Sequence, residues 1–396
     1  MKNLKIGFVS TFTPDSNYSQ FLGEAINSLD RNLDLLCYAP SNEDISNLKV
    51  KNKKNFWNKF LYPIQIFLMS LKDQLDVIHF QYEFNMYGSV VFSTFFPLAL
   101  FLQKLIRRKV IVTMHVVVSE NEINDDFKST FNAKNIPASF IKTWFYINYF
   151  FTVFFSDSVI VHSGCFKEIL LKDYKARKAD KIFIVHLGVP IYKTHDYKKI
   201  VNKLLGNYEN KKMILSFGYI TKRKGLGYLV EAFERLSKKH KNIILVIAGG
   251  VLEYERKYVE SLKDRIKNKK VIVILDKFLT LEEIKALYSN TYISVFPYTY
   301  SISASACSAF SISYLTPLVL TDIGSFRDDV EKDSIGLLVR KRNASDLQNA
   351  IETLISDGKR YNKIKENMRK VRKEREWTNI AVKTISLYKT HGIDTI

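Results

Sequence analysis

Residues 213–250 read MILSFGYITKRKGLGYLVEAFERLSKKHKNIILVIAGG, and the pattern of this stretch decides the fold class. Apolar runs at 213–218 and 243–250 have the length and composition of buried strands. The segment between them carries apolar residues at the i, i+3, i+4 spacing that lays one face of a helix on a sheet. That stripe comprises Leu226, Leu229, Val230, Phe233 and Leu236. A strand, a crossover helix and a second strand predict a parallel sheet.

The same alternation continues in both directions along the chain. Further strands are expected at 4–10, 77–82, 109–115, 158–163, 181–187, 271–276, 293–298, 317–322 and 335–339. A capping box of Thr280 and Glu283 predicts the start of one intervening helix. The polar, lysine-rich segment 192–212 lacks a strand signal and is interpreted as a linker. We therefore expect an α/β protein with two Rossmann-like doubly wound domains, 1–195 and 205–375, facing each other across a cleft at the carboxyl ends of the strands.

The bulk composition favours two domains in a reducing compartment. A chain of 396 residues with 46% apolar residues can bury two cores. Its three cysteines, Cys37, Cys165 and Cys307, form no C-x-x-C pair, so neither a disulfide framework nor a structural zinc site is expected. The N-terminal sequence MKNLKIGFVS enters a strand directly, without the features of a secretory signal, which predicts a cytoplasmic protein.

The net charge of +20 predicts attraction to polyanions: nucleic acid, anionic lipid or phosphate-bearing substrates. Charge alone does not choose among them. Two aromatic-rich stretches, 90–105 and 140–155, are shorter than the roughly 20 residues that span a bilayer. Pro97 and Lys142 interrupt them as well. We interpret both stretches as helices that pack on a parallel sheet.

A basic turn is the first candidate for a binding site. Gly218 ends a predicted strand, and Lys222, Arg223, Lys224 and Gly225 lead into the next helix. Free backbone N–H groups, the positive end of the helix dipole and the nearby cations would all favour a phosphate there. The alternative is a solvated basic turn. The chain has neither a G-x-G-x-x-G fingerprint nor a P-loop, which disfavours a dinucleotide enzyme or a P-loop NTPase.

A run of small residues, 301–308, is the second candidate. If a helix begins near Ser303, the N–H groups of its first turn form another anion site, and serine hydroxyls add donors. Serine and alanine also permit close helix packing, which is the alternative interpretation.

Together these runs resemble the C-terminal nucleotide-binding domain of family 4 glycosyltransferases, which are retaining enzymes with the GT-B fold. The resemblance is strongest over 213–339, where the order FG, KG, LVEAF, LVIAGG, LEEI, LY, VFPY, SAS, TP, TDIGSFRD and GLLV matches the family element by element. LKIGFVSTF, DVIHFQYE, VIVTMH and SDSVIVHS are weaker N-terminal similarities. Trp377 and the stripe Ala381, Ile385 and Tyr388 resemble the final helix of the family, here 376–396, which crosses back to the N-terminal domain.

The resemblance implies transfer of a sugar from a nucleoside diphosphate to an acceptor hydroxyl with retention of anomeric configuration. Catalysis must then stabilise the negative charge of the departing diphosphate. Lys224 occupies the position of the lysine that contacts the phosphates, and the amides around Ser303, Ser305 and Ala306 would hold the same group. No D-x-D element is present, so we expect neither a metal ion nor a cofactor besides the sugar-nucleotide substrate.

The remaining site residues are assigned by the same resemblance. His115 matches a histidine that contacts the donor sugar. His115 and Lys224 are the two predicted catalytic residues. The other predicted donor-binding residues are Gly218, Tyr219 and Arg223, with Lys277 and Phe278 near the base. The acceptor is expected near the loop 11–18, with Thr11 and Phe12, and near Gln81 and Glu83.

The chain departs from the family pattern at three positions. Many members carry two glutamates eight positions apart, where this chain has Ile302 and Phe310. Tyr219 stands where an arginine is common, and Arg223 could replace that charge. The pair Ser305–Ala306 resembles a branch with a Ser-Gly pair that also lacks the glutamates. We expect a variant donor site, with an inactive GT-B-like nucleotide- or glycan-binding partner as the alternative.

Two further partners were weighed. A nucleic-acid-binding protein ranks low, because the basic residues are spread along the chain and no recognised module is present. The segment 51–72 places lysines beside Phe56, Trp57, Phe60 and Leu61, as in an interfacial helix. It predicts peripheral contact with an anionic membrane at the cytoplasmic face, and the alternative is a basic loop followed by a buried helix. The acceptor would be a glycan, a polysaccharide or a glycolipid.

Overall fold

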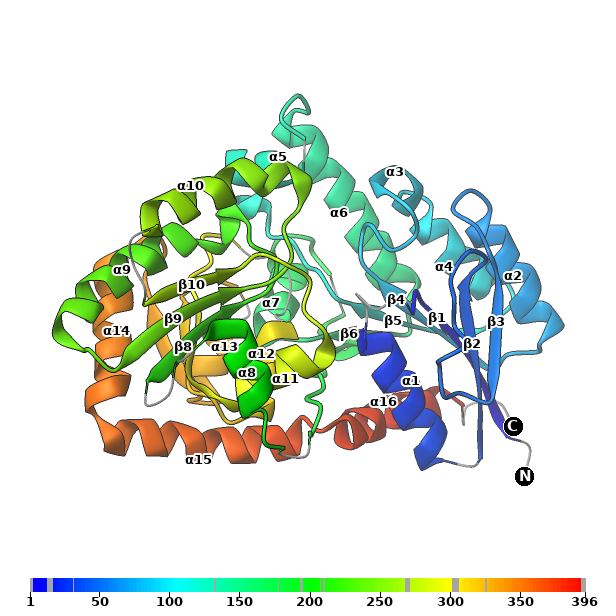
Figure 1. Cartoon of the computed structure of the whole chain (residues 1–396). Coiled ribbons are helices and arrows are strands. Elements are labelled where there is room, and N and C mark those ends of the chain that lie inside the picture. Colours follow the sequence, from blue (N-terminus) through cyan, green and yellow to red (C-terminus); the bar gives the residue numbers. More distant parts are fainter. Residues whose placement is uncertain are drawn as a thin grey trace. The chain divides into compact units, whose positions relative to one another are not determined.

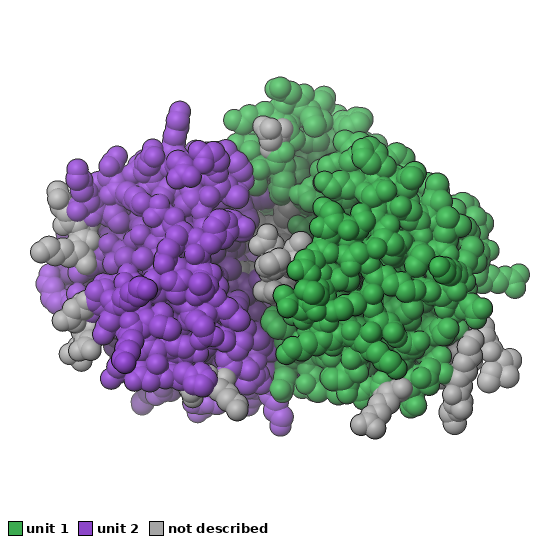
Figure 2. Space-filling view, turned by 45° about the vertical axis from the view of Figure 1, so that its right-hand side comes forward, with its two compact units in different colours: residues 1–188, 302–304, 375–396 green, residues 189–301, 305–374 purple. Residues whose placement is uncertain are grey.

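The computed structural model describes residues 3–12, 17–30, 32–131, 133–176, 178–192, 195–206, 208, 211–267, 271–300, 306–324 and 326–392 (Figure 1). The chain divides into two compact units, which Figure 2 colours separately. Unit 1 takes the described residues of Met1–Gly188 and of Arg375–Ile396, and unit 2 takes most of those between them. The division thus falls after Gly188, earlier than the expected end of the first domain at residue 195.

The described part of unit 1 contains a seven-stranded parallel sheet in the order β3-β2-β1-β4-β5-β6-β7. The strands are β1 (Leu4–Val9), β2 (Leu33–Pro40), β3 (Asn52–Trp57), β4 (Val77–Tyr82), β5 (Lys109–Met114), β6 (Ser158–Val161) and β7 (Ile182–Ile184). The strand order reverses between β1 and β4, so the carboxyl ends of these two strands form a topological switch point. Ligands of open α/β sheets bind at such points.

Helices cover both faces of this sheet (Figure 1). The helix between β1 and β2 crosses the sheet toward β3, whereas the helices between β4 and β5 and between β5 and β6 cross it toward β7. Because crossovers are right-handed, the first of these helices lies on the opposite face from the other two. On its side, α1 (Asn17–Leu29) packs against α16 (Trp377–Gly392). On the other side, α2 (Tyr62–Lys72), α4 (Phe96–Leu105) and α6 (Ala138–Phe155) pack side by side. The shorter helical elements are α3 (Val90–Ser93), η2 (Glu120–Glu122), α5 (Asp125–Thr130), α7 (Gly164–Lys172) and η3 (Ala179–Lys181).

Two strands of unit 1 were missed by the sequence analysis. β2 is an ordinary buried strand, whereas β3 carries the polar sequence NKKNFW at the sheet edge. The lysines of β3 have partners within the protein: Lys54 pairs with Asp73 at 2.7 Å, and Lys53 donates to backbone carbonyls. Trp57 is buried. The prediction of one interfacial helix over 51–72 is therefore wrong in its first half, because strand pairing uses those residues.

The apolar stretch 90–105 is also two helices, with Pro97 in the first turn of α4, where proline is tolerated. No helix among the described residues has both the length and the apolarity to span a membrane.

The C-terminal helix α16 is part of the core of unit 1. Its predicted stripe, Ala381, Ile385 and Tyr388, is buried in one apolar cluster with residues of β1 and α1. The Tyr388 hydroxyl lies 2.7 Å from Nδ1 of His79, which is buried in β4. The crossing of this helix to the N-terminal sheet therefore rests on packing and on one buried polar pair.

The described part of unit 2 contains a six-stranded parallel sheet in the order β10-β9-β8-β11-β12-β13. The strands are β8 (Lys212–Phe217), β9 (Ile243–Ala248), β10 (Ile272–Leu275), β11 (Thr291–Phe296), β12 (Leu318–Thr321) and β13 (Gly336–Val339). The helical elements are α8 (Lys198–Leu205), η4 (Lys222–Lys224), α9 (Leu226–Lys239), η5 (Glu253–Glu255), α10 (Arg256–Ile266), α11 (Leu281–Ser289), α12 (Ala306–Ser313), α13 (Phe326–Glu331), α14 (Ala344–Ser356) and α15 (Gly358–Glu374).

The helix predictions for unit 2 are confirmed where they rest on periodicity and capping. The stripe of α9 is buried throughout, and Thr280 and Glu283 form the expected capping box of α11. The linker interpretation of 192–212 is wrong, because this segment contains α8 and packs Tyr197, Val201 and Tyr208 into an apolar cluster of unit 2.

Tyr388→Phe tests the buried contact of α16. The change should lower the free energy of unfolding of unit 1 by about 1–3 kcal/mol, because a buried ring nitrogen of His79 loses its partner. Urea unfolding monitored by circular dichroism measures the effect, and Ser386→Ala, at an exposed position of the same helix, is the matched control. Equal midpoints for the two variants would contradict this account of the helix.

Candidate functional site

The basic turn of unit 2 is held tightly against the neighbouring strand. Gly225 has φ +66°, and a Cβ atom on it would lie 2.0 Å from the carbonyl oxygen of Pro297. The backbone N–H of Thr299 donates to the Arg223 carbonyl at 2.9 Å. A side chain at residue 225 would collide with backbone, so only glycine permits this approach. The turn between β8 and α9 is thereby fixed to the carboxyl end of β11.

Lys224 lies where this turn meets the start of α12. Its Nζ atom is 3.6 Å from the centroid of the Tyr298 ring. A Cβ atom on Gly218, which has φ +121°, would lie 3.8 Å from this Nζ and 3.1 Å from Sγ of Cys307. Cys307 follows Ala306, the first described residue of α12. Gly218, Lys224 and Ala306, three of the predicted donor residues, therefore come from elements that converge, whereas Ser303 and Ser305 lie outside the described residues.

The charged form of the Lys224 side chain is disfavoured by its surroundings. Burial, reinforced by the nearby Arg223 guanidinium, lowers its pKa to about 7. Among the described residues, no carboxylate lies within ion-pair distance of it. The ring of Tyr298 offers a cation–π contact but no formal charge. An anion placed beside Lys224 would supply the missing counter-charge.

Two aromatic rings stand near the turn. Tyr219 follows Gly218, and its ring centroid lies 5.8 Å from that of Phe278 with the planes nearly perpendicular. Phe278 is 70% exposed and lies against Gly250, where a Cβ atom would come within 2.8 Å of the ring. Glycine thus makes room for a ring whose outer surface is available for stacking. Lys277 instead forms an ion pair with Glu283 at 2.8 Å, which ties it to the cap of α11.

Phe310 fills one of the two positions where many family members carry a glutamate. Its ring stacks on Tyr288 with centroids 5.4 Å apart and packs against an apolar cluster of unit 2. Tyr288 in turn donates a hydrogen bond to the carbonyl of Cys307 at 3.1 Å. Residue 310 therefore supports α12 by packing and offers no carboxylate. Ile302, the other position, lies outside the described residues.

His115, at the end of β5 in unit 1, belongs to a hydrogen-bonded chain. Its Nδ1 lies 3.1 Å from Nε2 of His162, and its Nε2 lies 3.0 Å from Oε1 of Gln81. His162 donates from Nδ1 to the Val185 carbonyl at 2.9 Å. Burial is the main cause that lowers the pKa of His115 well below its usual value, and the neighbouring histidines act in the same direction. The ring is therefore neutral, and both of its nitrogens already have protein partners.

Gln81, predicted to lie near the acceptor, is part of the same hydrogen-bonded chain. Its side chain is fully buried between His115 and His79, with its Nε2 3.0 Å from Nε2 of His79. His79 contacts Thr113 and Tyr388 on its other sides. The Gln81 amide thus links two histidines, and its assignment to the acceptor stays a prediction.

The other acceptor predictions divide between buried and half-buried residues. The Phe12 side chain is buried and its ring lies 6.1 Å from that of Phe8, so its contact with an acceptor stays a prediction. Its backbone N–H donates to Oε1 of Glu43, a residue that the sequence analysis missed. Thr11 and Glu83 are half-buried, and burial raises the pKa of the Glu83 carboxyl.

Glu43 is a further acidic group on the same side of this sheet. Burial raises the pKa of its carboxyl to about 7, against the opposing effect of the Phe12 N–H. Glu43 follows β2, and Glu83 follows β4. Because both residues follow the carboxyl ends of parallel strands, this edge of the sheet carries two carboxyl groups that retain protons more readily than usual. The position of Glu43 after a strand would have identified it had β2 been predicted.

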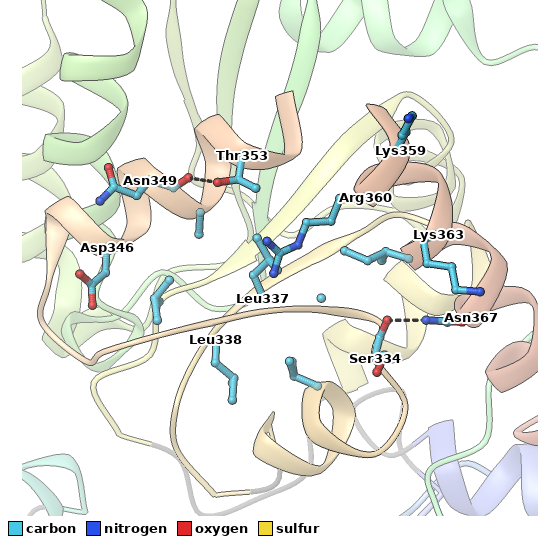
Figure 3. Close-up of a pocket in the computed structure, with 15 residues that line it drawn as sticks. Ser334, Leu337, Leu338, Asp346, Asn349, Thr353, Lys359, Arg360, Lys363 and Asn367 are labelled. Atoms are coloured by element: carbon cyan, nitrogen blue, oxygen red, sulfur yellow. Dashed lines mark hydrogen bonds between the residues drawn. The ribbon is translucent and has the colours of Figure 1, made fainter. Parts of the chain in front are cut away.

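A cavity of about 790 Å³ in unit 2 has a different location (Figure 3). It is lined by the edge strand β13 and by α14 and α15, with Asn349, Thr353, Arg360 and Lys363 among its walls. None of the predicted site residues lines it. This cavity therefore lies apart from the Lys224 turn.

Comparison with known proteins supports the class of protein that this fold suggests. Residues 198–371 match the family model described as Glycosyl transferases group 1. An uncharacterized glycosyltransferase of Methanocaldococcus jannaschii is 27% identical over 241 residues, which are 59% of this chain and 60% of that protein. The chain thus spans about three fifths of the length of this relative.

Solved structures share the whole architecture. A glycosyltransferase from Rickettsia africae superposes with a TM-score of 0.76 at 17% identity and covers 100% of both chains. The Anabaena protein HepE in complex with UDP has a TM-score of 0.73 at 14% identity, covering 98% of this chain and 100% of its own. HepE has also been solved with UDP-glucose. The fold is GT-B, and the family match with this fold supports a group 1 glycosyltransferase.

The lowered pKa of Lys224 predicts that binding of a diphosphate takes up a proton. Above pH 7 the free lysine is largely neutral, and a bound anion should raise its pKa, so affinity should fall as the pH rises from about 7. Titration calorimetry of UDP at pH 8, in buffers with different ionisation enthalpies, should show uptake approaching one proton per nucleotide.

Lys224→Met is the matched variant for this measurement, because it keeps most of the length of the side chain without the ammonium group. Equal proton uptake by this variant and the unmodified protein would contradict the assignment to Lys224.

Proposed function

We propose that this protein is a retaining glycosyltransferase that moves a sugar from a nucleoside-diphosphate sugar to an acceptor hydroxyl. One observation carries the proposal. The Lys224 ammonium lies where the Gly218–Gly225 turn contacts the start of α12, and its pKa is lowered. Among the described residues it has no carboxylate partner. The UDP and UDP-glucose complexes of the similarly folded HepE support a sugar nucleotide as the donor.

The chemistry follows from the charge of the leaving group. As the glycosidic bond to the diphosphate breaks, negative charge builds on the phosphate oxygen, and a nearby cation stabilises that charge. Lys224 would supply the positive charge, and the N–H groups at the start of α12 would add donors. This arrangement would neutralise the diphosphate without a metal ion. Tyr219 and Phe278 would stack on the nucleobase.

The residues of unit 1 would serve the sugar and the acceptor. His115 is held by His162 and Gln81, so its orientation is fixed before substrate binds. Its neutral ring would contact the donor sugar without bringing a second positive charge. Glu83 and Glu43 would hydrogen-bond acceptor hydroxyls, and the pKa of Glu43, raised by burial to about 7, favours a partly protonated carboxyl that can donate as well as accept.

The proposal extends to acceptor and location. The acceptor would be a glycan or a lipid-linked glycan in polysaccharide or glycolipid synthesis of the cell envelope. The protein would work in the cytoplasm and meet the cytoplasmic face of the membrane, and its charge of +20 supports attraction to anionic lipid. Nucleic acid is not proposed as a partner.

A thermal-shift panel of nucleoside diphosphates and sugar nucleotides tests donor binding, because a ligand that binds only the native state raises its apparent stability. Lys224→Ala should weaken the affinity for the responding nucleotide about 10- to 100-fold, the range expected for loss of a charge-assisted hydrogen bond. Transfer activity should be lost with it.

Lys222→Ala is the matched control, because Lys222 is an exposed lysine of the same turn. It should bind the nucleotide nearly as well as the unmodified protein. Equal nucleotide affinity of Lys224→Ala and the unmodified protein would reject the donor site. Binding without transfer to any acceptor would favour the inactive partner protein instead.

A further inference from the structure

Unit 1 exposes large apolar side chains on the outer surface of α2, α3, α4 and α6. The six most exposed are Phe60 (73%), Leu68 (56%), Val91 (69%), Leu105 (60%), Phe140 (66%) and Phe154 (63%). Monomeric proteins rarely expose contiguous apolar surface on this scale unless it binds something. We call this surface the apolar face.

The helices that carry the apolar face are neighbours in unit 1 (Figure 1) and contact one another. The rings of Phe60 and Phe92 lie 4.7 Å apart and join the start of α2 to α3. The Trp144 indole on α6 donates to Oγ1 of Thr94 at 2.9 Å, just before α4 begins. Helices α2 and α4, and α4 and α6, also pack directly together.

Helix α6 shows that this exposure is built into the sequence. One of its stripes, with Ile141 and Phe145, is buried in unit 1. A second stripe at helical spacing carries Phe140, Ile147 and Phe154 to the surface. A helix that needed only to cover the sheet would have polar residues on this second side, so the outer stripe requires a separate explanation.

The charges around the apolar face decide what can cover it. The sequences of α2, α3, α4 and α6 contain no aspartate or glutamate. They contain Lys72 and Lys142, and Lys59 and Arg107 flank them, whereas Lys104 is paired with Asp157 and the flanking Asp73 is paired with Lys54. A second copy of the chain would bring the same basic rim against this one, which is unfavourable. An anionic bilayer offers apolar chains to the rings and negative charge to the rim.

A pocket at the end of α6 continues the apolar face inward. It has a volume of about 420 Å³ and is lined by Phe150, Val153, Phe154, Ala176, Lys178 and Lys181. Phe154 belongs to both the pocket and the face. The Lys181 ammonium donates to the carbonyl of Ser156 at 2.8 Å, while Lys178 is exposed. Apolar walls with an exposed ammonium group match a lipid with an acyl chain and a phosphate headgroup.

We propose that the apolar face lies on a bilayer containing anionic phospholipid and that the pocket beside α6 takes an acyl chain with its headgroup phosphate at Lys178. This inference rests on the membrane contact in the proposed function and not on the transfer reaction. It keeps the second half of the segment 51–72 in that contact, with Phe60 and α2, and adds α3, α4 and α6.

Vesicle flotation of the full chain tests the inference. The unmodified protein should float with phosphatidylcholine vesicles containing about one third phosphatidylglycerol, less so as salt rises, and poorly with phosphatidylcholine alone. The triple variant Phe60→Ser, Leu68→Ser and Phe154→Ser should bind the anionic vesicles about tenfold less, because it removes three exposed apolar anchors. Lys178→Glu should weaken binding to the anionic vesicles and leave the weak binding to phosphatidylcholine unchanged.

Val382→Ser combined with Tyr254→Ser is the matched control, because both side chains are exposed and apolar but lie outside the apolar face. It should float like the unmodified protein. Equal flotation of the triple variant would overturn the proposal. So would a concentration-dependent dimer of the unmodified protein that the triple variant loses, since a second copy would then cover the face.

The UDP thermal shift of each variant keeps the two proposals separate. A variant that retains the shift is folded, so its loss of flotation reports on the apolar face. Flotation with no response to any nucleotide would leave the membrane proposal standing and defeat the transferase. A thermal shift with a nucleotide but no flotation would reject the membrane proposal and leave the transferase proposal standing.

Discussion

An ammonium group enclosed by protein is unfavourable unless something nearby compensates its charge, and the organisation of unit 2 centres on one such group. Lys224 lies over the ring of Tyr298 and beside Gly218, and its pKa is lowered to about 7. The close approach of Gly225 to the carbonyl of Pro297 holds the lysine there, because any side chain at 225 would push the turn away. The close backbone contact at Gly225 therefore holds the Lys224 ammonium where its charge calls for a nearby anion.

In unit 1, several buried polar side chains are hydrogen-bonded to one another. Its buried groups compensate one another in a chain from Tyr388 through His79 and Gln81 to His115 and His162. This chain joins the C-terminal helix to the ends of central strands, and burial lowers the pKa of each of its histidines below the usual value. One unit thus offers a cation that lacks a described counter-charge, and the other offers a neutral, rigid histidine.

The apolar face concerns where positive charge and exposed apolar side chains occur together in the chain. The positive charge is spread over the whole chain, and the helices α2, α3, α4 and α6 combine an absence of acidic residues with exposed large apolar side chains. Their exposed rings are therefore framed only by cations within those helices.

The sequence by itself determined the parallel strands with apolar cores, the buried stripe of α9, the capping box at Thr280 and the glycine-lysine turn, because each is a local pattern read over a few residues. It did not determine β3, whose polar residues become a strand only by pairing with β2, nor α8, whose apolar residues are explained only by the cluster they enter. Only the tertiary structure decided that Gln81 is buried between histidines, that Glu43 caps the Phe12 backbone, and that Cys307 reaches the Lys224 turn. These are contacts between residues distant in the chain. Their partners are set by the packing of whole elements, which local periodicity and composition do not specify.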